Sequence, residues 1–75
     1  MKIYTIKIEQ GPFTWDSYKG HVVVANTEEE VRDLAKKISA DEGKEVWDSA
    51  KVEHCGDSVW QETEPFILLS DFVRG

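Results

Sequence analysis

The sequence contains a single cysteine, Cys55, and no apolar run that approaches the ~20 residues of a membrane-spanning helix. One cysteine excludes an internal disulfide, so the fold must be held by packing alone, which suits a reducing compartment. Residues 1–5 have the pattern of a strand, and no signal-peptide core follows them. We therefore expect a soluble, intracellular protein.

The sequence also lacks the motifs on which most enzyme and metal sites depend. It has no glycine-rich phosphate loop, nucleophile elbow or helix-borne histidine pair. His54 and Cys55 are adjacent, but neighbouring side chains of a strand point to opposite faces and cannot form a dyad. His21, His54 and Cys55 do not have the spacing of metal ligands. We expect no enzyme activity and no cofactor or metal, with Cys55 a small buried residue whose thiol reacts slowly.

Basic residues are few, with nine Lys and Arg against 15 Asp and Glu, a net charge of −6. This balance argues against direct binding to nucleic acid, whose phosphates require basic side chains, and against binding to anionic membranes. A chain of 75 residues makes one small domain with room for one helix on one sheet. A deep catalytic cleft does not fit in such a domain.

The clearest element is a helix that begins after Thr27. Thr27 and Glu30 have the spacing of a capping box, in which each side chain accepts a hydrogen bond from the other residue's backbone N–H. The apolar stripe of this helix consists of Val31, Leu34, Ala35 and Ile38. Acidic residues in its first turn and lysines in its last suit the helix dipole, and Gly43 is the expected stop.

Strand-like runs flank this helix at residues 2–9, 21–25, 51–55 and 66–73. We expect one α+β domain over residues 1–75, an antiparallel four-stranded sheet with one helix packed on one face, in the order β-β-α-β-β. Residues 66–73 begin apolar on both faces, which predicts a central strand. Residues 57–65 are expected to form a hairpin connection, and residues 45–47 a short extended piece.

The connection at residues 10–20 carries three aromatic side chains, Phe13, Trp15 and Tyr18. Glycines at positions 11 and 20 and a proline at position 12 make it too irregular for a helix. Its aromatics either fold over the edge of the core or present a contact surface, and the sequence leaves both alternatives open.

The net charge is concentrated in residues 41–64, which hold eight acidic and two basic residues, whereas residues 1–40 and 65–75 are each neutral. With two interleaved tryptophans, this segment is the candidate binding site: Asp41, Glu42, Glu45, Trp47, Asp48, Asp57, Trp60, Glu62 and Glu64. On one side of the domain, such a set would form a negative patch with aromatic anchors, suited to a basic groove on a partner. The alternative is solubilising loop charge with both tryptophans in the core.

Several short segments stand out along the chain: WDSY at 15–18, VVVANTEEEV at 22–31, EVW at 45–47, CG at 55–56 and FILLSDF at 66–72, followed by Gly75. Together they resemble a group of short, uncharacterised proteins carried by bacteria and their phages, over most of the chain. No active site is known in that group, so the resemblance implies no catalytic residue. In size, acidity and lack of enzyme motifs the chain also resembles anti-CRISPR proteins, small phage products that block the nucleic-acid-binding or partner surfaces of a CRISPR effector.

The resemblance implies an inhibitor in the cytoplasm of a bacterial host. Its partner would be a protein, specifically the basic nucleic-acid-binding surface of a CRISPR effector, with no direct contact to nucleic acid or membrane. The alternative from the residues is a homodimeric interaction module that uses an open sheet face made by Ile3, Val23, Ile67 and Leu69.

Overall fold

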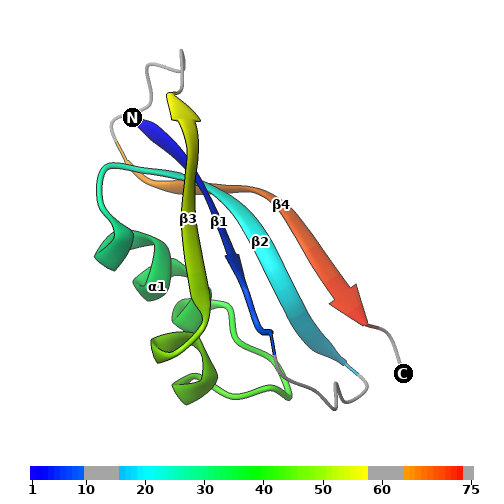
Figure 1. Cartoon of the computed structure of the whole chain (residues 1–75). Helices are drawn as coiled ribbons and strands as arrows, with labels where there is room; N and C mark the ends of the chain where they lie inside the picture. Colours follow the sequence, from blue (N-terminus) through cyan, green and yellow to red (C-terminus); the bar gives the residue numbers. More distant parts are fainter. Residues whose placement is uncertain (10–15, 58–63, 74–75) are drawn as a thin grey trace.

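The computed structural model describes residues 1–9, 16–57 and 64–73 as one antiparallel sheet with a helix on one face (Figure 1). The elements in chain order are β1 (Lys2–Lys7), β2 (Ser17–Ala25), α1 (Glu28–Lys37), the 3-10 helix η1 (Glu45–Asp48), β3 (Lys51–Asp57) and β4 (Phe66–Val73). The strands lie in the order β3-β1-β2-β4 across the sheet. The expected α+β fold with four antiparallel strands and one helix is therefore confirmed.

The capping box at the start of α1 is present as predicted. The Thr27 hydroxyl accepts a hydrogen bond from the Glu30 backbone N–H at 3.2 Å, and the Glu30 carboxylate accepts one from the Thr27 N–H at 3.0 Å. The helix ends at Lys37 with Ile38 as its C-cap, so it is shorter than a stop at Gly43 implied. Gly43 instead occupies a later turn with a φ of 82°, which glycine adopts without strain.

The core lies between the sheet and the layer made by α1 and η1. Tyr4 and Ile6 of β1 and Val23 of β2 pack there against Val31 of α1 and Trp47 of η1. Ile67 of β4 packs against this cluster but is only partly buried. The core is thus built mainly from β1, β2, α1 and η1.

Three predictions about the C-terminal half are wrong. Residues 66–73 form an edge strand rather than a central one, and β3 and β4 lie at opposite edges of the sheet, so no hairpin joins them. The two-sided apolar pattern that suggested a central strand instead leaves Leu68 and Leu69 46% and 66% exposed. Residues 45–47 lie in η1 and are helical rather than extended.

Register shifts decide which side chains share a face. Val22 pairs with Leu69 but Val23 pairs with Ile67, so Leu68 falls at a shift in β4. As a result Leu69 lies on the helix-free face, whereas Ile67 lies on the face that packs against α1. The residue set expected for an open sheet face is therefore wrong in two members, because Ile67 and the fully buried Val23 both belong to the core side.

The aromatic connection is only partly described. β2 begins at Ser17, four residues before the predicted position 21, so Tyr18 is a strand residue. Its ring lies 4.7 Å from that of Phe72 in β4 and 4.9 Å from that of His21, between centroids. Tyr18 thus covers the end of the core, while Phe13 and Trp15 lie outside the described residues.

Replacing Thr27 with alanine removes the hydroxyl that accepts the Glu30 N–H. We expect the free energy of unfolding to fall by about 1 kcal/mol, as for other N-cap losses. Urea unfolding of Thr27→Ala beside Thr27→Ser, which keeps the hydroxyl, tests this. An equal loss in both variants would show that the cap contributes nothing.

Candidate functional site

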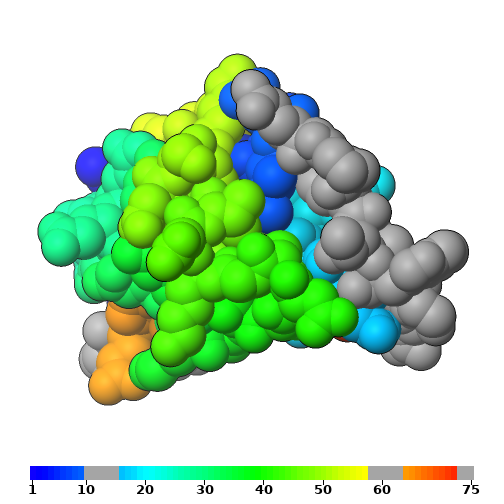
Figure 2. Space-filling model, turned by 90° about the horizontal axis from the view of Figure 1, so that it is seen from below, coloured from blue at the N-terminus to red at the C-terminus, as the bar shows by residue number. Residues whose placement is uncertain are grey.

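The predicted acidic segment does not form one patch. Asp41, Glu45 and Asp48 lie on the loop after α1 and on η1, at the end of the molecule seen in Figure 2, and we call these three residues the acidic end. Asp57 lies at the far end of β3. Because a strand rises about 3.3 Å per residue, the two ends of β3 are about 20 Å apart. The structure thus separates Asp57 from the acidic end.

Glu42 lies beside the acidic end but serves the fold. Its carboxylate accepts hydrogen bonds from the Tyr18 backbone N–H at 3.0 Å, the Ala40 backbone N–H at 3.1 Å and the Trp47 indole N–H at 3.0 Å. These bonds connect the start of β2, the loop after α1 and η1. The assignment of Glu42 to a partner-binding surface is corrected, since its oxygens are occupied within the domain.

Trp47 is also a core residue rather than a surface anchor. Its side chain is 0% exposed and packs in the main apolar cluster. Its backbone carbonyl accepts a hydrogen bond of 2.9 Å from the Arg32 guanidinium, which also donates to the carbonyl of Ala50 at 2.8 Å. The expected aromatic anchor is therefore wrong for Trp47, while Trp60 and Glu62 lie outside the described residues.

The remaining carboxylates differ in how they are paired. Asp48 forms an ion pair with Lys36, and the hydrogen bond that the Lys36 ammonium donates to the Asp48 carboxylate raises the pKa of Lys36 above its usual value. Among residues 1–9, 16–57 and 64–73, Asp41 and Glu45 make no ion pair. Both are exposed, so they are the charges of the acidic end that a partner can neutralise.

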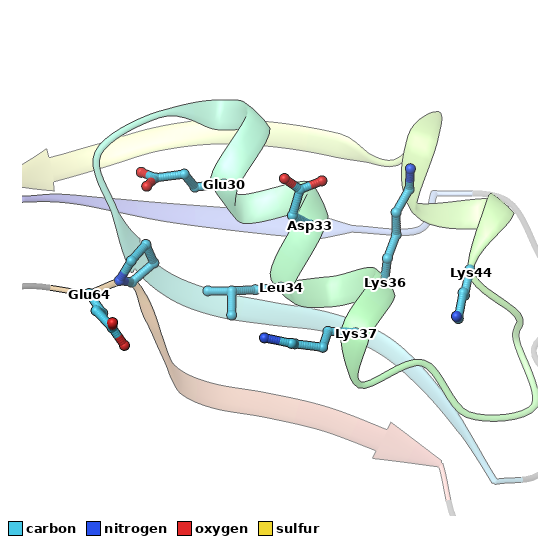
Figure 3. Close-up of a pocket in the computed structure, with 8 residues that line it drawn as sticks. Glu30, Asp33, Leu34, Lys36, Lys37, Lys44 and Glu64 are labelled. Carbon is cyan, nitrogen blue, oxygen red and sulfur yellow. The ribbon is translucent and has the colours of Figure 1, made fainter.

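Glu64 lies in a different place, at a groove between α1 and the start of β4 (Figure 3). The groove has a volume of about 690 Å³ and is lined by Glu30, Asp33, Leu34, Lys36, Lys37, Lys44, Glu64 and Pro65. Leu34 and Lys37 extend from α1 toward Glu64, whereas Lys36 points away from Lys37. Charges of both signs line this groove, so it does not extend a negative patch.

A buried histidine cluster was not predicted from the sequence. His21 is 4% exposed, and its ring lies between those of Tyr18 and Trp47, with centroids 4.9 and 5.0 Å away. Its Nδ1 shares a hydrogen bond of 2.7 Å with the Ser70 hydroxyl, while its buried Nε2 has no hydrogen-bond partner in the described part of the chain. Burial lowers the pKa of His21, and the nearby Glu42 charge partly opposes that effect.

Cys55 is exposed, which contradicts the expectation of a buried thiol. It lies on the edge strand β3, where the register shifts between Ile3 and Tyr4, and its sulfur is 3.7 Å from the Thr5 hydroxyl.

No cluster of three or more metal-ligating side chains occurs in the described parts of the chain. Within those parts, no helix has the length and apolar character to cross a membrane.

Replacing Glu42 with alanine leaves three donors without their acceptor. We expect the free energy of unfolding to fall by about 2–4 kcal/mol, since the Tyr18 and Trp47 donors are partly buried and costly to leave unsatisfied. Asp41→Ala is the matched control at the neighbouring exposed carboxylate, with an expected change below about 0.5 kcal/mol. Similar losses in the two variants, measured by urea unfolding, would contradict the internal role of Glu42.

His21 should make stability depend on pH. Its pKa in the folded protein lies below the unfolded value of 6.5, so the unfolded chain binds more protons as the pH falls through that range. The free energy of unfolding should therefore decrease from about pH 7.5 to about pH 5.5. Urea unfolding should show this slope reduced in His21→Phe and retained in His54→Gln; an unchanged slope in His21→Phe would exclude His21 as its source.

Comparison with known proteins assigns the chain to no family. No protein-family model, no curated protein and no solved structure matches the chain.

Proposed function

We propose that this protein acts by binding, as a non-enzymatic inhibitor of a nucleic-acid-handling complex in the bacterial cytoplasm, in the manner of anti-CRISPR proteins. The observation that carries the proposal is the acidic end, where Asp41 and Glu45 are exposed and form no ion pair with another described residue. A basic surface that normally binds phosphate would be the complementary partner.

The acidic end is held in place by the fold. The Asp41 backbone N–H donates to the Asp16 carbonyl at 3.1 Å, and the adjacent Glu42 carboxylate fixes Ala40 and Trp47. Arg32 holds the carbonyls at both ends of the Trp47–Ala50 turn. A segment whose backbone is already fixed loses less conformational entropy on binding than a mobile loop does. The affinity of such a segment for its partner is higher for that reason.

The net charge of the protein also supports a basic partner. The whole chain carries a net charge of −6. It therefore repels nucleic acid and is attracted to basic surfaces that bind nucleic acid. Exposed charges mainly accelerate association and set specificity, and salt weakens both effects by screening the charges. Binding should therefore be strongly salt-dependent.

The test compares two triple variants that remove the same charge from different places. Asp41→Asn, Glu45→Gln and Asp48→Asn neutralise the acidic end, whereas the control substitutions Glu29→Gln, Glu53→Gln and Asp57→Asn neutralise exposed acids elsewhere. Each protein is measured by biolayer interferometry against a panel of purified CRISPR effector complexes across a salt series, with target-DNA cleavage as the second readout.

For an effector that the unmodified protein binds, the acidic-end variant should lose at least about tenfold in affinity and show a shallower salt dependence. The control variant should stay within about threefold of the unmodified protein. Equal losses in both variants would assign binding to net charge rather than to the acidic end. No binding to any effector complex in the panel would contradict the partner class.

A further inference from the structure

The two edges of the sheet differ in how they are protected from association. β3 carries exposed charges at Lys51, Glu53 and Asp57. Charged side chains on an edge strand block edge-to-edge pairing in natural sheets. β3 is therefore a closed edge.

β4 differs from β3 in its side chains, although both edge strands have a register shift against their inner neighbours. Leu68 is 46% exposed, Leu69 66% and Phe72 37%, and Asp71 is the one charged residue between Phe66 and Val73. A long edge strand with exposed apolar side chains presents its backbone to another strand and loses apolar surface when it pairs. β4 is therefore an open edge.

The apolar side chains of β4 continue onto the helix-free face of the sheet, where Val24 is fully buried and its neighbours Ile3, Val22 and Phe66 are half-buried. Along one row of the register, Ile3 of β1 pairs with Val24 of β2, and Val24 pairs with Phe66 of β4. In the neighbouring row Val22 pairs with Leu69. Leu69 thus joins the open edge to an apolar face that no described helix covers (Figure 1).

We propose that a second copy of this chain pairs its β4 antiparallel with β4, across a two-fold axis near Leu69, to form a continuous sheet in a homodimer. In this arrangement the same surface is used by both copies, as in most small homodimers. Leu69 lies against Leu69 of the other copy and Phe72 lies against its Phe66, so the pairing removes part of the exposed apolar surface of both side chains from water. The inference does not rest on the proposed function, because β4 contains no residue of the acidic end.

The charge distribution favours a second copy at β4 over a second copy at the acidic segment. The net charge of −6 lies within residues 41–64, whereas residues 65–75 are neutral. With the axis at Leu69, Asp71 faces Ile67 of the other copy, and the two Asp71 residues are four positions apart along the strands. At about 3.3 Å per residue they are separated by about 13 Å, beyond the ~8 Å screening length at physiological salt.

The asymmetry of the edges also sets the size of the assembly. A dimer through β4 leaves the charged β3 strand at both ends of the joined sheet. Further copies would have to pair with that closed edge, so association stops at two chains. An assembly that used two open edges would instead grow into fibres.

The first experiment is light scattering on the full chain after size exclusion, over a concentration series. We expect a mass of twice the 8.6 kDa chain, with dissociation on dilution.

Leu69→Lys should weaken the dimer at least about tenfold, because it places two like charges at the axis. Cys55→Lys, which adds the same charge to the exposed edge β3, should leave the dimer intact. A monomer at every concentration, assemblies larger than a dimer, or equal effects of the two substitutions would overturn the proposal.

A cross-linking experiment tests the position of the axis without weakening the dimer. In a Cys55→Ser background, Leu69→Cys places one thiol on each copy beside the axis, where paired Cα atoms lie within disulfide range. Mild oxidation should give a covalent dimer. Glu53→Cys in the same background is the matched control on β3 and should stay monomeric on a denaturing gel. Equal cross-linking at both positions, or cross-linking at position 53 alone, would contradict pairing through β4. Circular dichroism confirms that each variant is folded.

Discussion

The Glu42 carboxylate is the interaction on which the arrangement of this small domain most depends. It accepts hydrogen bonds from the start of β2, from the loop after α1 and from the indole of Trp47. Trp47 is the largest fully buried side chain among the residues that the structure describes, and its N–H can enter the core because this acceptor is present. One carboxylate thereby fixes the position of η1 against the sheet, and with it the geometry of the acidic end.

The fold class could be predicted because local signals agreed with one another. The capping box at Thr27 and the apolar stripe behind it identify α1, and β-branched runs identify the strands. Strand order could not be predicted, because a run that is apolar on both faces fits a central strand and an edge strand with an exposed apolar surface equally well. The register shift at Leu68 further changes which side chains share a face, and the residue pattern does not reveal it.

The candidate site was predictable in composition but not in arrangement. Charge counting identified the acidic segment, yet nothing in residue type separates the internal Glu42 from the exposed Asp41 beside it. Asp57 is distant because β3 runs across the sheet, which follows from topology rather than from sequence spacing. His21 was missed, although a histidine that opens an otherwise apolar run of valines is a signal for a buried imidazole with a shifted pKa.

The position of β4 has a consequence for local stability. The fully buried side chains of the core come from β1, β2, α1 and η1, and β4 contributes only the partly buried Ile67 to that cluster. A strand with little buried apolar surface opens at a lower free energy than the whole domain. Detachment of β4 would leave the described core intact and uncover the outer side of β2. β3, the other edge strand, contributes only the partly buried Val52 to the same cluster, so in the isolated chain both edge strands are expected to open at a lower free energy than the central pair β1 and β2.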